Sequence, residues 1–365
     1  MSSDITDNIT KIKLGISHGD INGIGYEVIL KALIDIRINE FFTPILYGSS
    51  KVLAYHRKAL DIENFSLNSI RHPSEANHKR ANIINCTDDN VRVELGKSTE
   101  LAGSASLKAL ERAVEDLKNG EIDVLVTAPI NKDNIQSNNF RFPGHTEYLM
   151  HKCQLKEVLM LMVGENLRVG VVTGHIPLKD VPGTLTEQLI LQKIRILNKT
   201  LIEDFDIAKP KIAVLSLNPH SGDNGLIGKE EIEIIIPAIK KAQEENIVAL
   251  GPYAADGLFG SKDYSKFDAI LAMYHDQGLA PFKAISFTSG VNYTAGLPFV
   301  RTSPAHGTAY ELAGKNEASE DSFRQAMYLA LDIFKNRLRY KKLNENPLRV
   351  NQEMINSVTK AGEHY

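Results

Sequence analysis

The fold of this 365-residue chain is decided by a pattern that is most compact in residues 168–175, RVGVVTGH. A short run of apolar, largely β-branched residues, typical of a buried strand, is followed at once by a glycine and a histidine. Similar apolar runs, also bounded by polar or turn-forming residues, lie at 13–17, 44–47, 123–127, 158–163, 211–217 and 269–273. Most of them precede a segment with helical periodicity, which predicts an α/β fold with a largely parallel sheet.

The chain is long enough to exceed one hydrophobic core, which favours two domains or lobes. Helices are expected from the glycines at 23–25 to about residue 33, and at 105–118, 185–205, 229–245 and 322–341. No repeat, low-complexity tract or linker marks a domain boundary. Residues 61–90 are the least periodic and richest in polar side chains, so we expect them to lie on the surface.

Composition excludes several classes of partner. The 42 Lys and Arg residues and 45 Asp and Glu residues give a net charge of -3 and are interspersed, which argues against nucleic acid or an anionic membrane as the main partner. The two cysteines, Cys86 and Cys153, form neither a disulfide framework nor a thiolate metal site. Because a secretory signal and a membrane-length apolar run are also missing, we expect a soluble, cytoplasmic protein.

Histidines follow three of the predicted strands, at His175, His220 and His275. In α/β sheets ligands collect at the carboxyl ends of strands. Three imidazoles that leave one coordination position open describe a catalytic metal site. Each histidine alone is equally well explained as a polar residue at a strand end, so a shared metal is a hypothesis.

Two other groups suit an anionic substrate. Residues 143–147, PGHTE, place His145 beside a hydroxyl and a carboxylate, which fits phosphate binding or proton transfer but also a simple helix cap. Lys283, Asn292 and Arg301 lie in a Gly- and Pro-punctuated segment, where they either bind phosphate or carboxylate or form a solvated surface.

Glycines at the start of the first helix form the segment GDINGIG, residues 19–25. Their spacing does not give the G-x-G-x-x-G dinucleotide fingerprint, so we give that interpretation little weight. The segment either brings backbone close to an anionic ligand at a helix start or makes a tight turn that requires glycine.

In order along the chain, the motifs resemble the 4-hydroxythreonine-4-phosphate dehydrogenase family of vitamin B6 biosynthesis, from about residue 14 to residue 323. The resemblance rests on GDINGIG (19–25), TAPINK (127–132), PGHTE (143–147), TGHIPL (173–178), LNPHSG (217–222), GPYAAD (251–256), MYHDQG (273–278) and GLPFVRTS (296–303). Ile21, Asn22 and Tyr26 depart from the family, which has Pro, Ala and Pro there.

The resemblance implies two α/β/α lobes with a cleft between them, as in isocitrate and isopropylmalate dehydrogenases. Residues 1–126 and 276–365 would form the first lobe, on the cofactor side, and residues 127–275 the second, on the metal and dimer side. The family also implies a homodimer whose active site, between the lobes, is completed by the second subunit.

The resemblance further assigns roles to individual residues. His175 and His220 of one subunit, with His275 of the other, would hold one divalent metal, zinc first, with magnesium or cobalt as alternatives. The positions that match substrate ligands are His145, Thr146, Lys283, Asn292 and Arg301. Asp256 and His145 are candidate catalytic residues.

Residues 305–309, AHGTA, look like the loop that contacts the adenosine half of NAD in related decarboxylating dehydrogenases. That likeness makes the cofactor NAD or NADP and assigns its binding to His306, Gly307, Thr308 and Ala309.

The implied reaction is oxidation of 4-phosphooxy-L-threonine at C3 to 2-amino-3-oxo-4-phosphooxybutanoate, which loses CO2 to give 3-amino-2-oxopropyl phosphate. The first alternative is a relative that oxidises erythronate or threonate 4-phosphate instead. From another class, the alternatives are a phosphate acyltransferase-like protein and an inactive metal-binding homologue.

Overall fold

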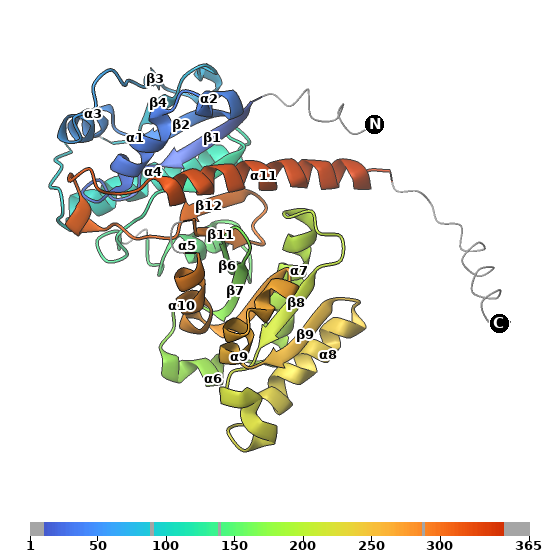
Figure 1. The fold of residues 1–365 in the computed structure, drawn as a ribbon. Helices are drawn as coiled ribbons and strands as arrows, with labels where there is room; N and C mark the ends of the chain where they lie inside the picture. Colours follow the sequence, from blue (N-terminus) through green and yellow to red (C-terminus); the bar gives the residue numbers. More distant parts are fainter. Residues whose placement is uncertain (1–10, 88–90, 138–139, 287–288, 347–365) are drawn as a thin grey trace.

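The computed structural model describes residues 11–87, 91–137, 140–286 and 289–346. One 12-stranded sheet runs through the molecule in the order β3-β4-β2-β1-β5-β12-β11-β6-β7-β10-β8-β9 (Figure 1). Its strands are β1 (Ile12–Ser17), β2 (Phe42–Gly48), β3 (Asn68–Ile70), β4 (Asn82–Asn85), β5 (Val124–Thr127), β6 (Leu159–Val163), β7 (Arg168–Thr173), β8 (Lys211–Leu215), β9 (Val248–Tyr253), β10 (Ala269–Tyr274), β11 (Val291–Ala295) and β12 (Val300–Pro304).

Helices alternate with most of these strands, so the predicted α/β architecture is confirmed. They are α1 (Gly25–Ile34), α2 (Ile38–Phe41), α3 (Ser50–Ala59), α4 (Glu100–Lys118), α5 (His145–Lys152), α6 (Val181–Thr184), α7 (Glu187–Glu203), α8 (Ile236–Glu244), α9 (Ala255–Gly260), α10 (His275–Ile285) and α11 (Asp321–Asn344). Among the helices described, none is both long and apolar enough to cross a membrane.

The sheet reverses direction at its centre. The strands from β3 to β12 pair in parallel, and so do the strands from β7 to β9. Between them, β11 is antiparallel to both β12 and β6, and β6 is antiparallel to β7. The prediction of a parallel sheet therefore holds within each half, while antiparallel strands join the two halves.

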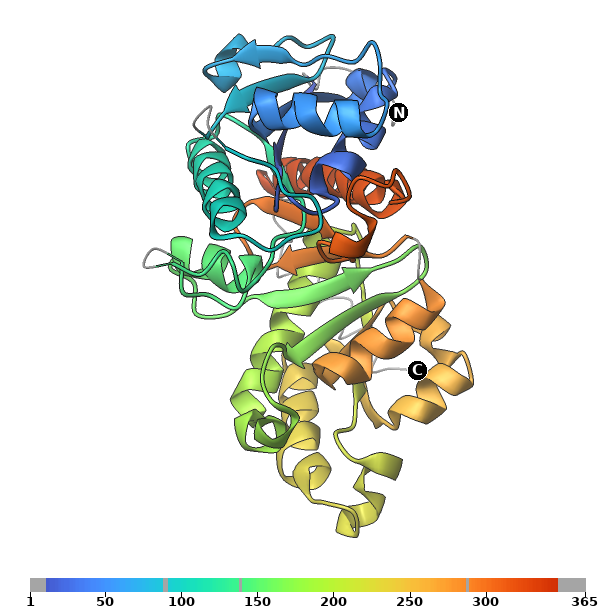
Figure 2. The ribbon, with the colours of Figure 1, turned by 90° about the vertical axis from the view of Figure 1, so that its left-hand side faces the viewer.

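The two faces of the sheet are covered differently. On one face α1, α7, α8 and α11 contribute to a single hydrophobic core that extends under both halves. On the other face the core is divided into one cluster under α4 and α5 and another under α9 and α10. Figure 2 shows the two halves as an upper and a lower lobe. The division leaves the centre of this face free for polar side chains.

Three segments contain strands that the sequence pattern did not reveal, and one of them is β9, which Gly251 and Pro252 interrupt. Residues 61–90 contribute β3 and β4, and Ile83 and Ile84 of β4 are buried, so this stretch is not merely surface-lying. The Gly- and Pro-punctuated segment 280–303 contains β11 and most of β12. The predicted domain boundaries at 126/127 and 275/276 stay a proposal. That division assigns α10 to the first lobe, whereas α10 packs on β7 and β10, which it assigns to the second.

Candidate active site

A polar cavity of about 240 Å³ lies where the core of this face is divided. It collects the ends of β5, β7 and β12, the start of α5 and α10, and the pocket-facing sides of β6 and β11. Its lining includes these sequence-predicted residues: His145, Thr146, His175, His275, Lys283, Asn292, Arg301, His306 and Gly307. The fold therefore brings together most of the predicted site, from segments far apart in the chain.

Arg301, in β12, is 2% exposed. Its guanidinium donates to the Thr127 hydroxyl from Nε (3.1 Å) and Nη2 (2.5 Å), and to the Thr294 hydroxyl from Nη1 (3.1 Å). Burial lowers the pKa of Arg301 to about 9, although the negative charge of Glu147 acts in the opposite direction and raises it. A buried cation held only by neutral hydroxyls retains capacity to bind an anion.

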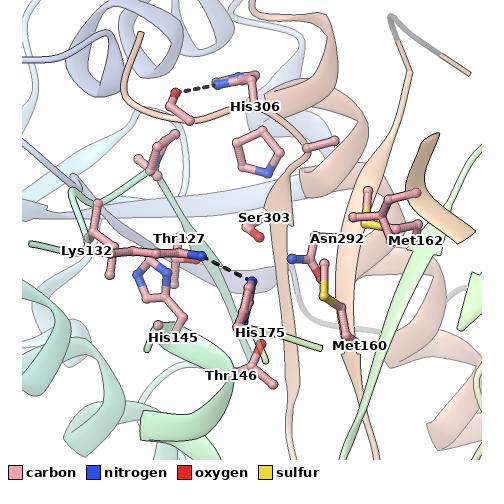
Figure 3. A pocket seen from close by; sticks show the side chains of 18 of the residues that line it. Thr127, Lys132, His145, Thr146, Met160, Met162, His175, Asn292, Ser303 and His306 are labelled. Carbon is pink, nitrogen blue, oxygen red and sulfur yellow. Dashed lines mark hydrogen bonds between the residues drawn. The ribbon is translucent and has the colours of Figure 1, made fainter. Parts of the chain in front are cut away.

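His145 opens α5 with its ring turned into the pocket (Figure 3). Burial, then the positive charges of Arg301 and Lys132, hold the pKa of His145 well below 6.5, so the ring is neutral near pH 7. Its Nε2 is buried without a hydrogen-bond partner, and so is Oδ1 of Asn292 on the opposite wall. Unpartnered buried polar atoms carry an energetic cost that a bound ligand can relieve.

His175 and His275 face each other, with 5.5 Å between their ring centroids. His175 follows β7, and His275 follows β10 as the first residue of α10. Because β7 and β10 pair in parallel, their carboxyl ends meet at one edge of the sheet. Lys132 Nζ lies 3.1 Å from Nε2 of His175, and the other ring nitrogen of His175, Nδ1, lies 3.4 Å from Glu147 Oε1. Burial raises the pKa of Glu147, but the His175 bond and nearby cations lower it overall.

His220 is not brought into this pocket. It is exposed and starts a run of five residues, 220–224, with left-handed backbone angles. Among residues 11–346 outside the three short gaps, no group of three or more His, Cys, Asp or Glu side chains is arranged to hold a metal. A single chain therefore supplies a pair of facing histidines, and the three-histidine site stays a prediction.

Three further predicted residues lie outside the pocket lining. Asp256 is exposed in α9, while Thr308 and Ala309 follow the lining residues His306 and Gly307. His306 Nδ1 lies 3.1 Å from the Gly307 carbonyl oxygen, and burial lowers the pKa of His306. Lys283 is exposed at the pocket rim, where an ammonium remains well hydrated.

Sequence reasoning did not single out several lining residues. Lys132 and Glu147 lie in motifs that were recognised, TAPINK and PGHTE, but were given no role. Met160 and Met162 project from β6 because alternate residues of a strand share a face. The alternation of leucine and methionine in 159–163, LMLMV, indicates a strand with two distinct faces. Because both faces are apolar, the pattern does not reveal which one lines the pocket.

Comparison with known proteins gives this geometry a family. The family model described as "Pyridoxal phosphate biosynthetic protein PdxA" matches residues 40–330. The chain belongs to the PdxA family. A relative from Bacteroides thetaiotaomicron named 4-hydroxythreonine-4-phosphate dehydrogenase is 58% identical over 93% of both chains. Another so named, from Sulfurihydrogenibium sp., is 42% identical over 88% of this chain and 98% of its own.

Solved structures support the PdxA assignment. The 4-hydroxythreonine-4-phosphate dehydrogenase of Klebsiella pneumoniae superimposes with a TM-score of 0.77 at 32% identity, covering 90% of this chain and 99% of that one. A terephthalate 1,2-cis-dihydrodiol dehydrogenase from Burkholderia xenovorans shares the fold at a TM-score of 0.60 and 23% identity, covering 88% of this chain and 98% of that one. The recognised family is thus confirmed.

Proposed function

We propose that this chain oxidises the C3 hydroxyl of 4-hydroxythreonine 4-phosphate, with a nicotinamide dinucleotide as hydride acceptor, in pyridoxal phosphate biosynthesis. One observation carries the proposal: a pocket lined by Arg301, Lys132 and Lys283 is formed largely by motifs that mark the family, in a chain 58% identical to a relative named for this activity. The product is a 3-oxo acid, which loses CO2 readily.

The phosphate and carboxylate of this substrate require cations at two places. Arg301 offers a desolvated guanidinium inside the pocket, and Lys283 an ammonium at its rim. Neutral His145 adds a ring nitrogen with no partner in the described chain. Charge-assisted hydrogen bonds of this kind are shorter and stronger than neutral ones, so they orient C3 for hydride transfer.

A divalent metal fits the donors at the pocket edge. The rings of His175 and His275 face each other, and the contact of the Lys132 ammonium with His175 Nε2 supports a lone pair on this nitrogen that would accept a metal in its place. The ring of His275 is oriented by Asp276, whose Oδ1 lies 2.7 Å from Nδ1. When bound, the metal would polarise the oxygen at C3, favouring loss of its proton and then of CO2.

The third imidazole is expected from a second copy of the chain, because His220 is exposed and does not line the pocket of its own chain. Apolar side chains are exposed on the segment after it, with Leu226 82% and Ile232 50% exposed. This segment forms the lower end of the molecule in Figures 1 and 2. Exposed apolar side chains beside an incomplete ligand set support a homodimer that shares its active sites.

The cofactor side of the pocket is formed by the segment that contains His306 and Gly307. NAD or NADP bound along residues 306–309 would supply the hydride acceptor. Methionines 160 and 162, with Leu279, line the pocket with apolar surface. Exclusion of water by such surface protects a transferred hydride and strengthens the nearby charge interactions.

The activity is tested by following reduced nicotinamide absorbance with 4-hydroxythreonine 4-phosphate, erythronate 4-phosphate and threonate 4-phosphate in parallel. We expect the highest kcat/KM for the amino acid. Preference for either non-amino acid would change the substrate, and no reduction of NAD or NADP by metal-loaded protein would favour an acyltransferase or an inactive homologue.

Metal dependence is tested by dialysis against a chelator, followed by separate additions of zinc, cobalt and magnesium. We expect activity to be lost on chelation and to return with the physiological ion. Direct titration with each metal, monitored by calorimetry, should show binding that is lost in His175→Ala. Full activity in protein that contains no metal would contradict this part of the proposal.

Subunit mixing determines which histidine crosses the interface. The family resemblance implies that the partner subunit's His275 joins His175 and His220, whereas the facing of His175 and His275 within one chain suggests that His220 crosses. His220→Ala mixed with His275→Ala should recover activity in both arrangements. Recovery in a mixture of His175→Ala and His275→Ala identifies His275 as the crossing ligand. Recovery in a mixture of His175→Ala and His220→Ala identifies His220 instead. No recovery in any mixture, despite exchange, would place the site in one subunit.

A further inference from the structure

The glycine segment, residues 19–25, is buried inside the chain rather than open to a ligand. Every residue from His18 to Leu30 is buried, and none of residues 19–25 lines the cavity. The segment instead lies between two segments that do line it, one at 127–132 and one at 303–307. Its glycines therefore need an explanation other than phosphate binding.

Close backbone contact on both sides explains the glycines. At Gly19, whose φ is +71°, an added Cβ would lie 2.3 Å from the Pro129 carbonyl oxygen, and at Gly23 it would lie 2.7 Å from that of Thr308. Backbone hydrogen bonds reinforce both contacts, from Asp20 N to Pro129 O (2.8 Å) and from Ile24 N to Thr308 O (3.0 Å). Glycine is required because any side chain would separate the three segments.

The Asp20 side chain joins the same two segments through hydrogen bonds. Its Oδ2 accepts from the Tyr310 hydroxyl and from Asn134 Nδ2, each at 2.8 Å, and Oδ1 accepts from Asn22 N at 2.8 Å. Burial and the charge of Asp20 raise the pKa of Tyr310 to about 12, so its hydroxyl remains a donor at neutral pH. Asn134 is two residues from Lys132, and Tyr310 three from Gly307.

Two of the three departures from the family pattern, Asn22 and Tyr26, anchor the segment with their side chains, whereas Ile21 contributes a backbone carbonyl that a proline would also offer. Asn22 donates to Lys97 O (2.8 Å) and Thr99 Oγ1 (3.1 Å) and accepts from Glu94 N (2.7 Å). The carbonyl of Ile21 lies 2.7 Å from His56 Nε2. The Tyr26 ring stacks between those of His18 and His56, at 5.2 and 5.0 Å.

We propose that Asp20 is a positioning residue, which sets the separation between the substrate side and the cofactor side of the pocket by holding Asn134 and Tyr310 on one carboxylate. The glycine segment acts as the rigid spacer that carries it. This inference rests on the proposed function, because it takes residues 127–132 to face the substrate and residues 306–309 to face the cofactor.

The test compares Tyr310→Phe, Asn134→Ala and the double variant. We expect Tyr310→Phe to raise the KM for the cofactor about five- to tenfold, less than the full value of a hydrogen bond to a charged group, because Tyr310 acts by positioning the loop that holds the cofactor. The KM for the phosphorylated substrate should also rise, because Asp20 transmits the change. The effects of the two variants should be less than additive, since both act through the same carboxylate.

Amide hydrogen exchange provides a readout that does not depend on activity. In Tyr310→Phe we expect faster exchange at residues 131–135, because Asn134 loses the hydroxyl both as its co-donor on Asp20 and as its own contact at 3.4 Å. This holds even if the wild-type enzyme oxidises another acid, so failure of the spacer and failure of the proposed substrate are distinguishable. Asp20→Asn replaces one acceptor oxygen by an NH2 donor where three donors meet, so both KM changes should be at least as large as in Tyr310→Phe.

Tyr47→Phe is the matched control, because Tyr47 also donates to a carboxylate from a buried site, to Asp116 at 2.8 Å, outside the pocket. It should lower stability and leave both KM values unchanged. The proposal is overturned if Tyr310→Phe behaves like Tyr47→Phe, with both KM values within about twofold of wild type and unchanged exchange at residues 131–135.

Discussion

The two faces of β11 present two buried polar clusters with opposite properties. Asn292 and Thr294 face the pocket, whereas Tyr293, between them, faces the continuous core under α7 and α11. Among the described residues, Arg301 on the pocket face donates only to threonine hydroxyls, and the Asn292 oxygen has no hydrogen-bond partner. On the core face Tyr293 donates to Asp204 at 2.6 Å, and Arg337 donates to Asp204 at 2.6 Å and to Tyr293 at 2.9 Å.

The difference separates binding from stability. The core-face network joins the end of α7 to β11 and α11, and its charges compensate each other within the protein. The pocket face leaves a cation only partly compensated, by Glu147, and several polar atoms unpartnered among the described residues, which costs stability until a ligand completes them. Arg301 of β12 and Arg337 of α11, which pack on opposite faces of β11, should therefore respond to the same substitution in opposite ways.

Replacing the pocket arginine should give the largest effect. Arg301→Met is expected to lower kcat/KM about 100- to 1,000-fold, because a charged hydrogen-bond donor to the substrate is lost. Its free energy of unfolding, measured in urea without ligand, should equal or exceed that of wild type, because a buried guanidinium is removed. A stable variant retaining more than about a tenth of wild-type kcat/KM would exclude Arg301 from substrate binding.

The core-face arginine should respond in the reverse sense. Arg337→Met is expected to lower the free energy of unfolding by about 2 to 3 kcal/mol, because Asp204, 2% exposed, loses its ion-pair partner. The folded variant should keep kcat/KM within about threefold of wild type. Urea unfolding and steady-state rates measure the two quantities, and a loss of activity as large as that of Arg301→Met would end the distinction between the faces.

The pH dependence of stability tests the neutral histidine on the pocket face. The pKa of His145 is well below 6.5 in the folded chain, so only the unfolded chain takes up this proton as the pH falls below about 6.5. Stability is complete above that pH and falls as the pH decreases toward the folded pKa, by up to about 1.4 kcal/mol per pH unit for each such histidine.

In His145→Asn the free energy of unfolding should therefore fall less between pH 7 and pH 5 than in wild type, by about 1 to 2 kcal/mol at pH 5. His18 and His56, whose pKa values are lowered to about 4 by burial, contribute with the same sign and remain in the variant. Urea unfolding between pH 5 and 7.5 measures the slope. Parallel profiles for the two proteins would mean that His145 is not held neutral.

The smallest expected change in the free energy of unfolding is at Tyr293 of β11, the strand whose two faces carry the two clusters. Tyr293→Phe removes one hydroxyl from the core-face network and should lower the free energy of unfolding by about 1 kcal/mol. Asn292, its neighbour, points to the other face, so kcat/KM should not change. A measurable change in the KM for either ligand would show that the two faces of β11 are coupled.

Local patterns predicted much of the fold, and motifs predicted the family. Strands 123–127, 168–173, 211–217 and 269–273 were found because a buried strand requires several consecutive apolar residues. The strands β3, β4, β11 and β12 were missed because they are short or carry polar residues on one face, as Asn292 and Arg301 do. The strand β9 was missed because Gly251 and Pro252 interrupt its apolar run. Their place in the sheet depends on pairing partners far away in sequence.

The sequence by itself determined the α/β class, the family and the histidines that follow strands, because these properties rest on local periodicity and on motifs. Only the tertiary structure decided which of those histidines meet. His175 and His275 follow adjacent parallel strands, whereas the chain turns His220 away through a left-handed stretch. The same holds for the glycine segment, whose contacts with Pro129 and Thr308 connect residues more than one hundred positions apart.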